Sequence, residues 1–178
     1  MTKNLIFKLV VTDGDEVVLD KSLSYEAISN VISNSNDCKE NSDLFDIAAS
    51  HPSSTVREYV AYKDNISDVT LKKLSTDSSI NVLRNLVRSS KFKEQASFDE
   101  VVHLLELDIE IAQSIAGDIE TFSEIDTGKL AQHIANHPDP SVVASLARNY
   151  GTPKKVLKAL LGHNDPYVVS EARERLAN

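Results

Sequence analysis

The chain has 178 residues, of which 41% are hydrophobic and 26% charged, a composition typical of one soluble domain with an appended element. Its formal net charge of −8 argues against general affinity for nucleic acid or anionic lipid. The single cysteine, Cys38, excludes an intramolecular disulfide, a thiolate zinc site and an iron–sulfur cluster. The chain has no apolar run of about 18 residues and no signal-peptide pattern, so we expect no membrane span and a cytoplasmic location.

The first predicted element is a β-hairpin. The segments 5–11 and 16–19 are rich in β-forming residues, and the turn signal Asp13-Gly14 stands between them. Because a lone hairpin is marginal in water, we expect it to lie on the helices or to pair with another chain.

A helix is predicted over residues 25–32, with Ser24 as its N-cap. The polar segment 34–42 then predicts a loop or hinge. We therefore expect an N-terminal hairpin and helix in residues 1–42 and a helical repeat domain in residues 43–178.

The remainder of the chain repeats one pattern. The strings HPSSTV (51–56), HPDPSV (137–142) and HNDPYV (163–168) end on a valine that we use as an anchor. Apolar anchors recur at spacings of 26 to 31 residues, at Val56, Val82, Ile111, Val142 and Val168. Three residues before each anchor stands a helix N-cap type, and four residues after it an apolar residue on the same helix face. The N-cap residues are Ser53, Ser79, Asp108, Asp139 and Asp165. The apolar residues after the anchors are Val60, Leu86, Ile115, Leu146 and Ala172. Each repeat is therefore predicted to begin an anchor helix at its N-cap residue.

A second helix is predicted before each anchor helix. Apolar pairs at i and i+3 stand eleven and eight residues before the anchor, at Phe45/Ala48, Leu71/Leu74, Ala131/Ile134 and Leu157/Leu160. In the third repeat these slots hold Glu100 and His103, and the apolar set slips by one residue. Start signals for these preceding helices are two capping boxes and an N-cap with proline, at Ser97–Glu100, Thr121–Glu124 and Thr152-Pro153. Such short helices are unstable alone and must stack on their neighbours.

The stretch DPSVVASLARNYGTPKKVLKALLGHNDPYVV (139–169) resembles the leucine-rich-repeat variant family, a relative of HEAT repeats. The matching residues are Asp139, Pro140, Val142, Leu146, Ala147, Asn149, Thr152, Pro153, Val156, Leu157 and Leu160. The resemblance covers about residues 43–178 and implies an all-α fold, a right-handed α–α superhelix of about five short repeats. Family members with an iron–sulfur cluster use an added cysteine cluster, which this chain lacks, so no cofactor is expected. The alternative fold is an ordinary helical bundle.

Two histidines have the spacing of a metal site. His133 and His137 are four residues apart, as two ligands on one helix would be. However, His137 occupies the same repeat slot as His51 and His163, where a histidine can bond the free carbonyls of a helix end. We favour this structural interpretation and predict no metal.

No pattern points to catalysis. Thr127-Gly128-Lys129 resembles the end of a phosphate-binding loop but lacks the upstream glycine. The acids around Gly14 are too closely spaced for a calcium loop and fit a solvated turn. Because the spacing suggests no nucleophile–base set, we predict a protein that is not an enzyme, without catalytic residues.

The favoured function is a scaffold for a protein or peptide partner, because stacked repeats create extended surfaces. Residues 108–136 carry six acids against one lysine, whereas residues 137–178 carry six bases against four acids. In related solenoids the helices that precede the anchors lie on the inner surface. The candidate partner-binding residues are the three lysines of the last such helix, Lys154, Lys155 and Lys158, together with Arg148 of the basic C-terminal repeats. The alternatives are nucleic-acid binding through these basic repeats, which the net charge disfavours, and homodimerisation through the hairpin.

Overall fold

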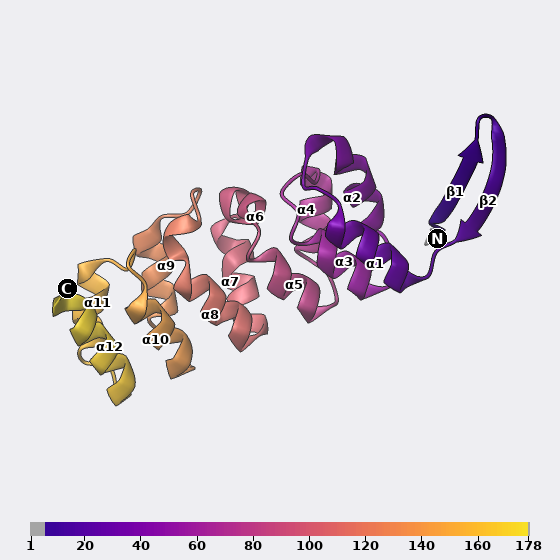
Figure 1. The fold of residues 1–178 in the computed structure, drawn as a ribbon. Coiled ribbons are helices and arrows are strands. Elements are labelled where there is room, and N and C mark those ends of the chain that lie inside the picture. The colour runs from indigo at the N-terminus through magenta and orange to yellow at the C-terminus, as the bar shows by residue number, and fades with distance from the viewer. Residues whose placement is uncertain (1–5, 178) are drawn as a thin grey trace. The chain divides into compact units, whose positions relative to one another are not determined.

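The computed structural model describes residues 6–177, and within them it is mostly helical, with twelve α-helices after a two-stranded antiparallel hairpin (Figure 1). This confirms the predicted mostly-α fold with an N-terminal hairpin, while the superhelix stays a prediction. The chain divides into two compact units, residues 1–89 and 90–178. The boundary predicted after residue 42 lies inside the first unit.

The first unit contains the hairpin and five α-helices. Its elements are β1 (Lys8–Asp13), β2 (Glu16–Ser22), α1 (Tyr25–Asn34), the 3₁₀ turn η1 (Lys39–Asn41), α2 (Ser42–Ala48), α3 (Ser54–Val60), α4 (Asp68–Leu74) and α5 (Ile80–Leu86). Ser24 caps α1 as predicted, since its hydroxyl accepts the Ala27 N–H. The predicted loop over 34–42 contains η1 and ends where α2 begins.

The second unit contains seven α-helices among its described residues. They are α6 (Ser90–Gln95), α7 (Phe98–Leu107), α8 (Ile109–Gly117), α9 (Thr127–Ile134), α10 (Pro140–Arg148), α11 (Lys154–Leu160) and α12 (Pro166–Ala177), with the 3₁₀ turn η2 (Ile119–Thr121) between α8 and α9. In the part of the chain that the structure describes, none of the helices has the length and apolar character needed to cross a membrane.

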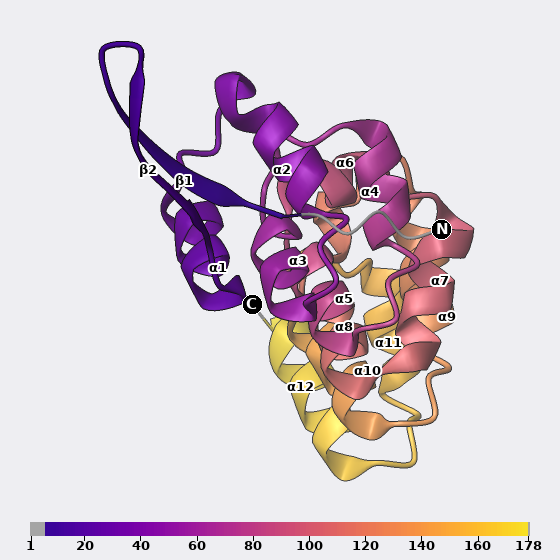
Figure 2. The ribbon, with the colours of Figure 1, turned by 90° about the vertical axis from the view of Figure 1, so that its right-hand side faces the viewer.

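The hairpin forms as predicted but does not lie on the helices. Gly14 sits at φ +60° in the turn, where a residue without Cβ is favoured. Every residue of both strands is exposed, and Figures 1 and 2 show the turn projecting away from the helices of the first unit. Its base is held by the Leu23 N–H to Phe7 carbonyl bond and by an edge contact between the Phe7 and His51 rings. Packing on the helices, one of the two expected outcomes, is therefore not what the structure shows.

The anchor residues of the repeats lie in the hydrophobic core. All five anchors and all five residues four positions later are at most 1% exposed. The anchor helices α3, α5, α8 and α10 begin directly after their predicted N-cap residues. Asp165 accepts the Tyr167 and Val168 N–H groups at the start of α12. The repeat phase inferred from the valine spacing therefore fixes both the start of each anchor helix and its buried face.

The preceding helices are α2, α4, α7, α9 and α11. Their predicted apolar pairs are buried, and in the third repeat the slip is confirmed because Val101, Leu104 and Leu105 are buried on α7. The capping box of Ser97 and Glu100 is present at the start of α7.

Two of the predicted helix starts are wrong. The segment Thr121–Glu124 caps nothing, because Ser123 is bonded to α6 through the Lys93 and Glu94 carbonyls. Helix α9 instead begins at Thr127, capped by Asp126. Thr152 is buried and donates to the Leu146 carbonyl, so that Pro153, one residue later, takes the N-cap position of α11.

The repeated histidines close the turns between paired helices, but not through the predicted bonds to carbonyls. In His51, His137 and His163 the ring Nδ1 accepts the backbone N–H of the residue two positions later, at 3.1, 3.1 and 3.0 Å. Asp77 fills the same slot in the second repeat and accepts the Ser79 N–H at 2.8 Å. Since Nδ1 is an acceptor, each neutral ring carries its proton on Nε2.

Candidate functional site

The four candidate residues are divided between two surfaces. Lys154, Lys155 and Lys158 lie exposed on α11. Arg148 lies at the end of α10 and donates to the Tyr167 hydroxyl at 2.7 Å. It lines a hollow with Tyr150 that none of the lysines borders. The structure therefore does not unite Arg148 with the lysines of α11.

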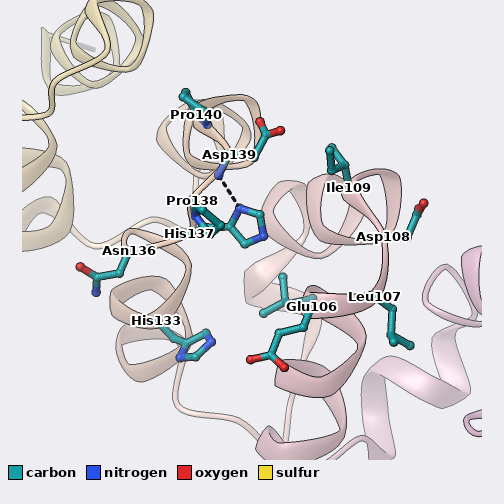
Figure 3. A pocket seen from close by; sticks show the side chains of 11 residues that line it. Glu106, Leu107, Asp108, Ile109, His133, Asn136, His137, Pro138, Asp139 and Pro140 are labelled. Carbon is teal, nitrogen blue, oxygen red and sulfur yellow. Dashed lines mark hydrogen bonds between the residues drawn. The ribbon is translucent and has the colours of Figure 1, made fainter.

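A hollow of about 740 Å³ lies between the α7–α8 turn and the α9–α10 turn. Figure 3 shows Glu106 of α7 and His133 of α9 facing each other across it, with His137 near the second turn. His137 is fixed by its bond from the Asp139 N–H at 3.1 Å, so its Nε2–H remains available as a donor. The His133 ring packs edge-on against Phe98, 5.9 Å between centroids.

A second hollow, of about 370 Å³, lies between α9 and α11. Its lining residues are Gln132, Ala135, Asn136, Lys155, Val156 and Ala159. Asn136 lines both hollows, so the two adjoin. We call the joined hollows the groove, and define it by Glu106, Gln132, His133, Asn136 and Lys155.

The groove arises from unequal helix packing within the second unit. The anchor helix α10 packs along both α8 and α12, whereas the preceding helices α9 and α11 touch each other only briefly. Packed helices lie about 8–10 Å apart, and a wider separation leaves space at the surface. The hollows therefore follow the side of the unit formed by the preceding helices.

Charge changes along the groove from acid to base. The first hollow is lined by three carboxylates, Glu106, Asp108 and Asp139, with neither lysine nor arginine among its described lining residues. Asp108 and Asp139 cap α8 and α10, and hydrogen bonds from the Ser141 side chain and N–H lower the pKa of Asp139. The second hollow is lined by Lys155 and, among described residues, by no acid.

Glu106 and Lys155 mark the two ends of the groove with opposite charges. Among residues 6–177 neither Glu106 nor Lys155 has an ion-pair partner. Lys129, on the same helix as His133, holds its ammonium 3.8 Å from the Phe98 ring centroid. Between the two ends, Gln132 and Asn136 present side-chain amides, and the Asn136 amide donates to the main-chain carbonyl of Gln132 at 2.8 Å.

The side chains that line the groove are amides, charged groups, imidazoles and apolar groups. In residues 6–177 no group of three or more histidine, cysteine or acidic side chains is placed to hold a metal. The described lining of the groove includes no serine, threonine or cysteine nucleophile. It offers amides, an imidazole N–H and two opposite charges beside apolar side chains, which suit recognition of a polar chain.

Sequence reasoning found Lys155 but not its partners in the groove. Glu106 occupies the repeat slot that holds histidine or aspartate in the other four repeats. This difference from the other repeats was the one feature of the sequence that could have singled out Glu106. His133 drew attention through its spacing from His137, yet its position opposite Glu106 depends on how α7 and α9 are placed. Comparison of the chain with protein families, curated proteins and solved structures finds no match.

Proposed function

We propose that this chain is a non-enzymatic repeat scaffold that binds an extended peptide segment of a protein partner in the groove of the second unit. The observation that carries the proposal is the pair of adjoining hollows with unpaired opposite charges at their ends. Stacked helical repeats are suited to this role because they create elongated surfaces.

Each part of the groove matches a need of a bound peptide. The amides of Gln132 and Asn136 can donate to and accept from main-chain groups. Apolar walls such as Leu107 and Val156 can cover side chains of the peptide. The acid at one end and the net charge of −8 favour a peptide over nucleic acid, whose phosphates would be repelled there.

Selection from a random peptide library tests the proposal. The full chain selects binders, which are then measured against Ala159→Trp, whose indole fills the second hollow. Ser170→Trp, at an exposed position of α12 outside the groove, is the matched control. We expect the selected peptides to lose most of their affinity for Ala159→Trp and to keep it for Ser170→Trp. Equal affinity for both variants would show that the groove is not the binding surface.

The hairpin favours a second function, pairing with a second copy of the chain. Three apolar residues lie on one face of the hairpin, Leu9, Val11 and Leu19, each 41–48% exposed. The β1 edge from Leu9 to Thr12 has no charge, and the adjacent Lys8 is engaged by Asp20 at 3.0 Å. Antiparallel pairing of two β1 strands about Val10 would place Leu9 opposite Val11 of the copy and extend the apolar face.

Oligomeric state tests this pairing. Val10→Lys puts a charge at the centre of the proposed seam, and Val69→Lys on α4, 79% exposed in the parent, is the control. Sedimentation velocity should show a dimer for the parent and for Val69→Lys, and a monomer for Val10→Lys. A monomeric parent at high concentration would rule the pairing out.

A further inference from the structure

We infer that the peptide held in the groove carries a cationic side chain at the Glu106 end and an anionic side chain at the Lys155 end. This inference rests on the proposed function and adds the chemical class of the partner. It follows from the charge on the lining of each hollow.

The first hollow selects a cation. Its described lining includes no lysine or arginine, and Glu106 is exposed and has no ion pair among residues 6–177. Asp108 and Asp139 are held as helix caps, which leaves Glu106 as the carboxylate able to approach a ligand directly. The unpaired charge of Glu106 in a concave site favours a guanidinium or ammonium group there.

His133 and His137 are oriented by residues other than Glu106. The His137 ring accepts the Asp139 N–H through Nδ1, and the His133 ring packs edge-on against Phe98. The Lys129 ammonium lies over the Phe98 ring and makes no ion pair with Glu106. Glu106 therefore stays without a counter-charge among the described residues.

The second hollow selects an anion. Lys155 lines it, and no acid does among the residues described there. Lys154 and Lys158 lie on the same helix, and within residues 6–177 none of the three has an ion-pair partner. A carboxylate of the peptide at this end would meet an unpaired ammonium group.

The separation of the two ends sets the spacing of the charges on the peptide. From α7 to α11 there are two helix-to-helix steps of about 10 Å or slightly more, hence about 20 Å. An extended chain advances about 3.3 Å per residue, so the two charges should lie about six residues apart.

The test repeats the library selection on charge-reversed chains. The parent should enrich peptides with one basic and one acidic residue about six positions apart. Glu106→Lys should instead enrich peptides with two acids, and Lys155→Glu peptides with two bases. Glu174→Lys on α12 and Lys72→Glu on α4 make the same changes in net charge outside the groove, and should select as the parent does.

Affinity measurements on one synthetic peptide from the parent selection complete the test. Glu106→Gln should weaken this peptide about threefold, the usual scale for an exposed ion pair, and replacing the peptide's basic residue by glutamine should then cost nothing more. Peptides that depend on the groove but show no charge pattern would overturn the inference and leave the proposed function standing. If no selected peptide loses affinity for Ala159→Trp, the proposed function fails, and the inference with it.

Discussion

The ion pair between Arg57 and Asp77 should be the most sensitive polar contact of the first unit. Arg57 donates through Nε and Nη2 to the two carboxylate oxygens of Asp77, at 2.6 and 2.8 Å. The two side chains are 13% and 7% exposed. Arg57 also donates to the His51 and Pro52 carbonyls, and Asp77 accepts the Ser79 N–H. The pair therefore links the turn before α3 to the turn before α5.

Asp77→Ala should destabilise the first unit by about 3–5 kcal/mol, because it leaves a mostly buried guanidinium without its counter-ion. It also removes the acceptor of the Ser79 N–H. Asp43→Ala, at an exposed acid on α2, changes the net charge equally and is the control. Native-state hydrogen exchange of the α3 and α5 amides measures the loss within this unit. A change below about 1 kcal/mol would refute the reasoning, because it would mean that the buried pair is not coupled to folding.

The same ion pair predicts how the free energy of unfolding falls at acid pH. Burial raises the pKa of Asp77, but hydrogen bonds from Arg57 and the Ser79 N–H, together with nearby positive charge, outweigh it and lower the pKa below the ordinary 3.8. A lowered folded-state pKa means that this stabilisation is complete above the unfolded-state value and is lost as pH falls through the folded-state value. Asp77→Asn should therefore flatten the fall in stability below about pH 4, the range in which an ordinary aspartate titrates. If the stability of Asp77→Asn falls with pH as that of the parent does, Asp77 does not contribute to the loss of stability at acid pH.

Further predictions concern the repeats and the two histidines with metal-site spacing. Val142→Asp places a carboxylate at a position with no exposure and should cost the second unit at least about 3 kcal/mol, whereas exposed Ser170→Asp should melt like the parent. Asp165→Ala removes a side chain that accepts the Tyr167 and Val168 N–H groups and should cost about 1 kcal/mol in denaturant titration. Ser53→Ala should change stability little, since the Ser53 side chain makes no cap bond; equal losses for the two would count against this difference in capping. Dialysis against a strong chelator should leave the melting curve unchanged, and a drop restored by zinc would contradict the interpretation of His133 and His137.

Short-range chemistry explains why most helices could be predicted. An N-cap residue and an apolar residue seven positions later constrain the same few turns of helix, so the anchor helices followed directly from the repeat. The errors arose where a segment resembled a cap but was used otherwise. Ser123 bonds to α6, and the Thr152 hydroxyl donates to the Leu146 carbonyl. Neither longer-range bond is visible in the local sequence.

The groove was only partly predictable for a related reason. Lys155 stood out because it lies in the basic segment 137–178, which follows the acidic segment 108–136. The opposition of Glu106 and His133, and the meeting of two hollows at Asn136, depend on the spacing of α7, α9 and α11. That spacing is set by how the anchor helices pack, which the residue pattern alone does not give. Arg148 was grouped with the lysines by sequence proximity, although it belongs to the Tyr150 and Tyr167 surface.

The most direct test of the central claim is an amide NMR titration of the full chain with a synthetic peptide from the parent selection. If the groove of the second unit binds it, the largest shifts should fall on Gln132, Asn136 and Lys155 and be absent in Ala159→Trp. The amides of α10 and α12 around Tyr150 and Tyr167 should change little. Shifts confined to that surface, or to the hairpin, would contradict the account and place the binding site elsewhere on the chain.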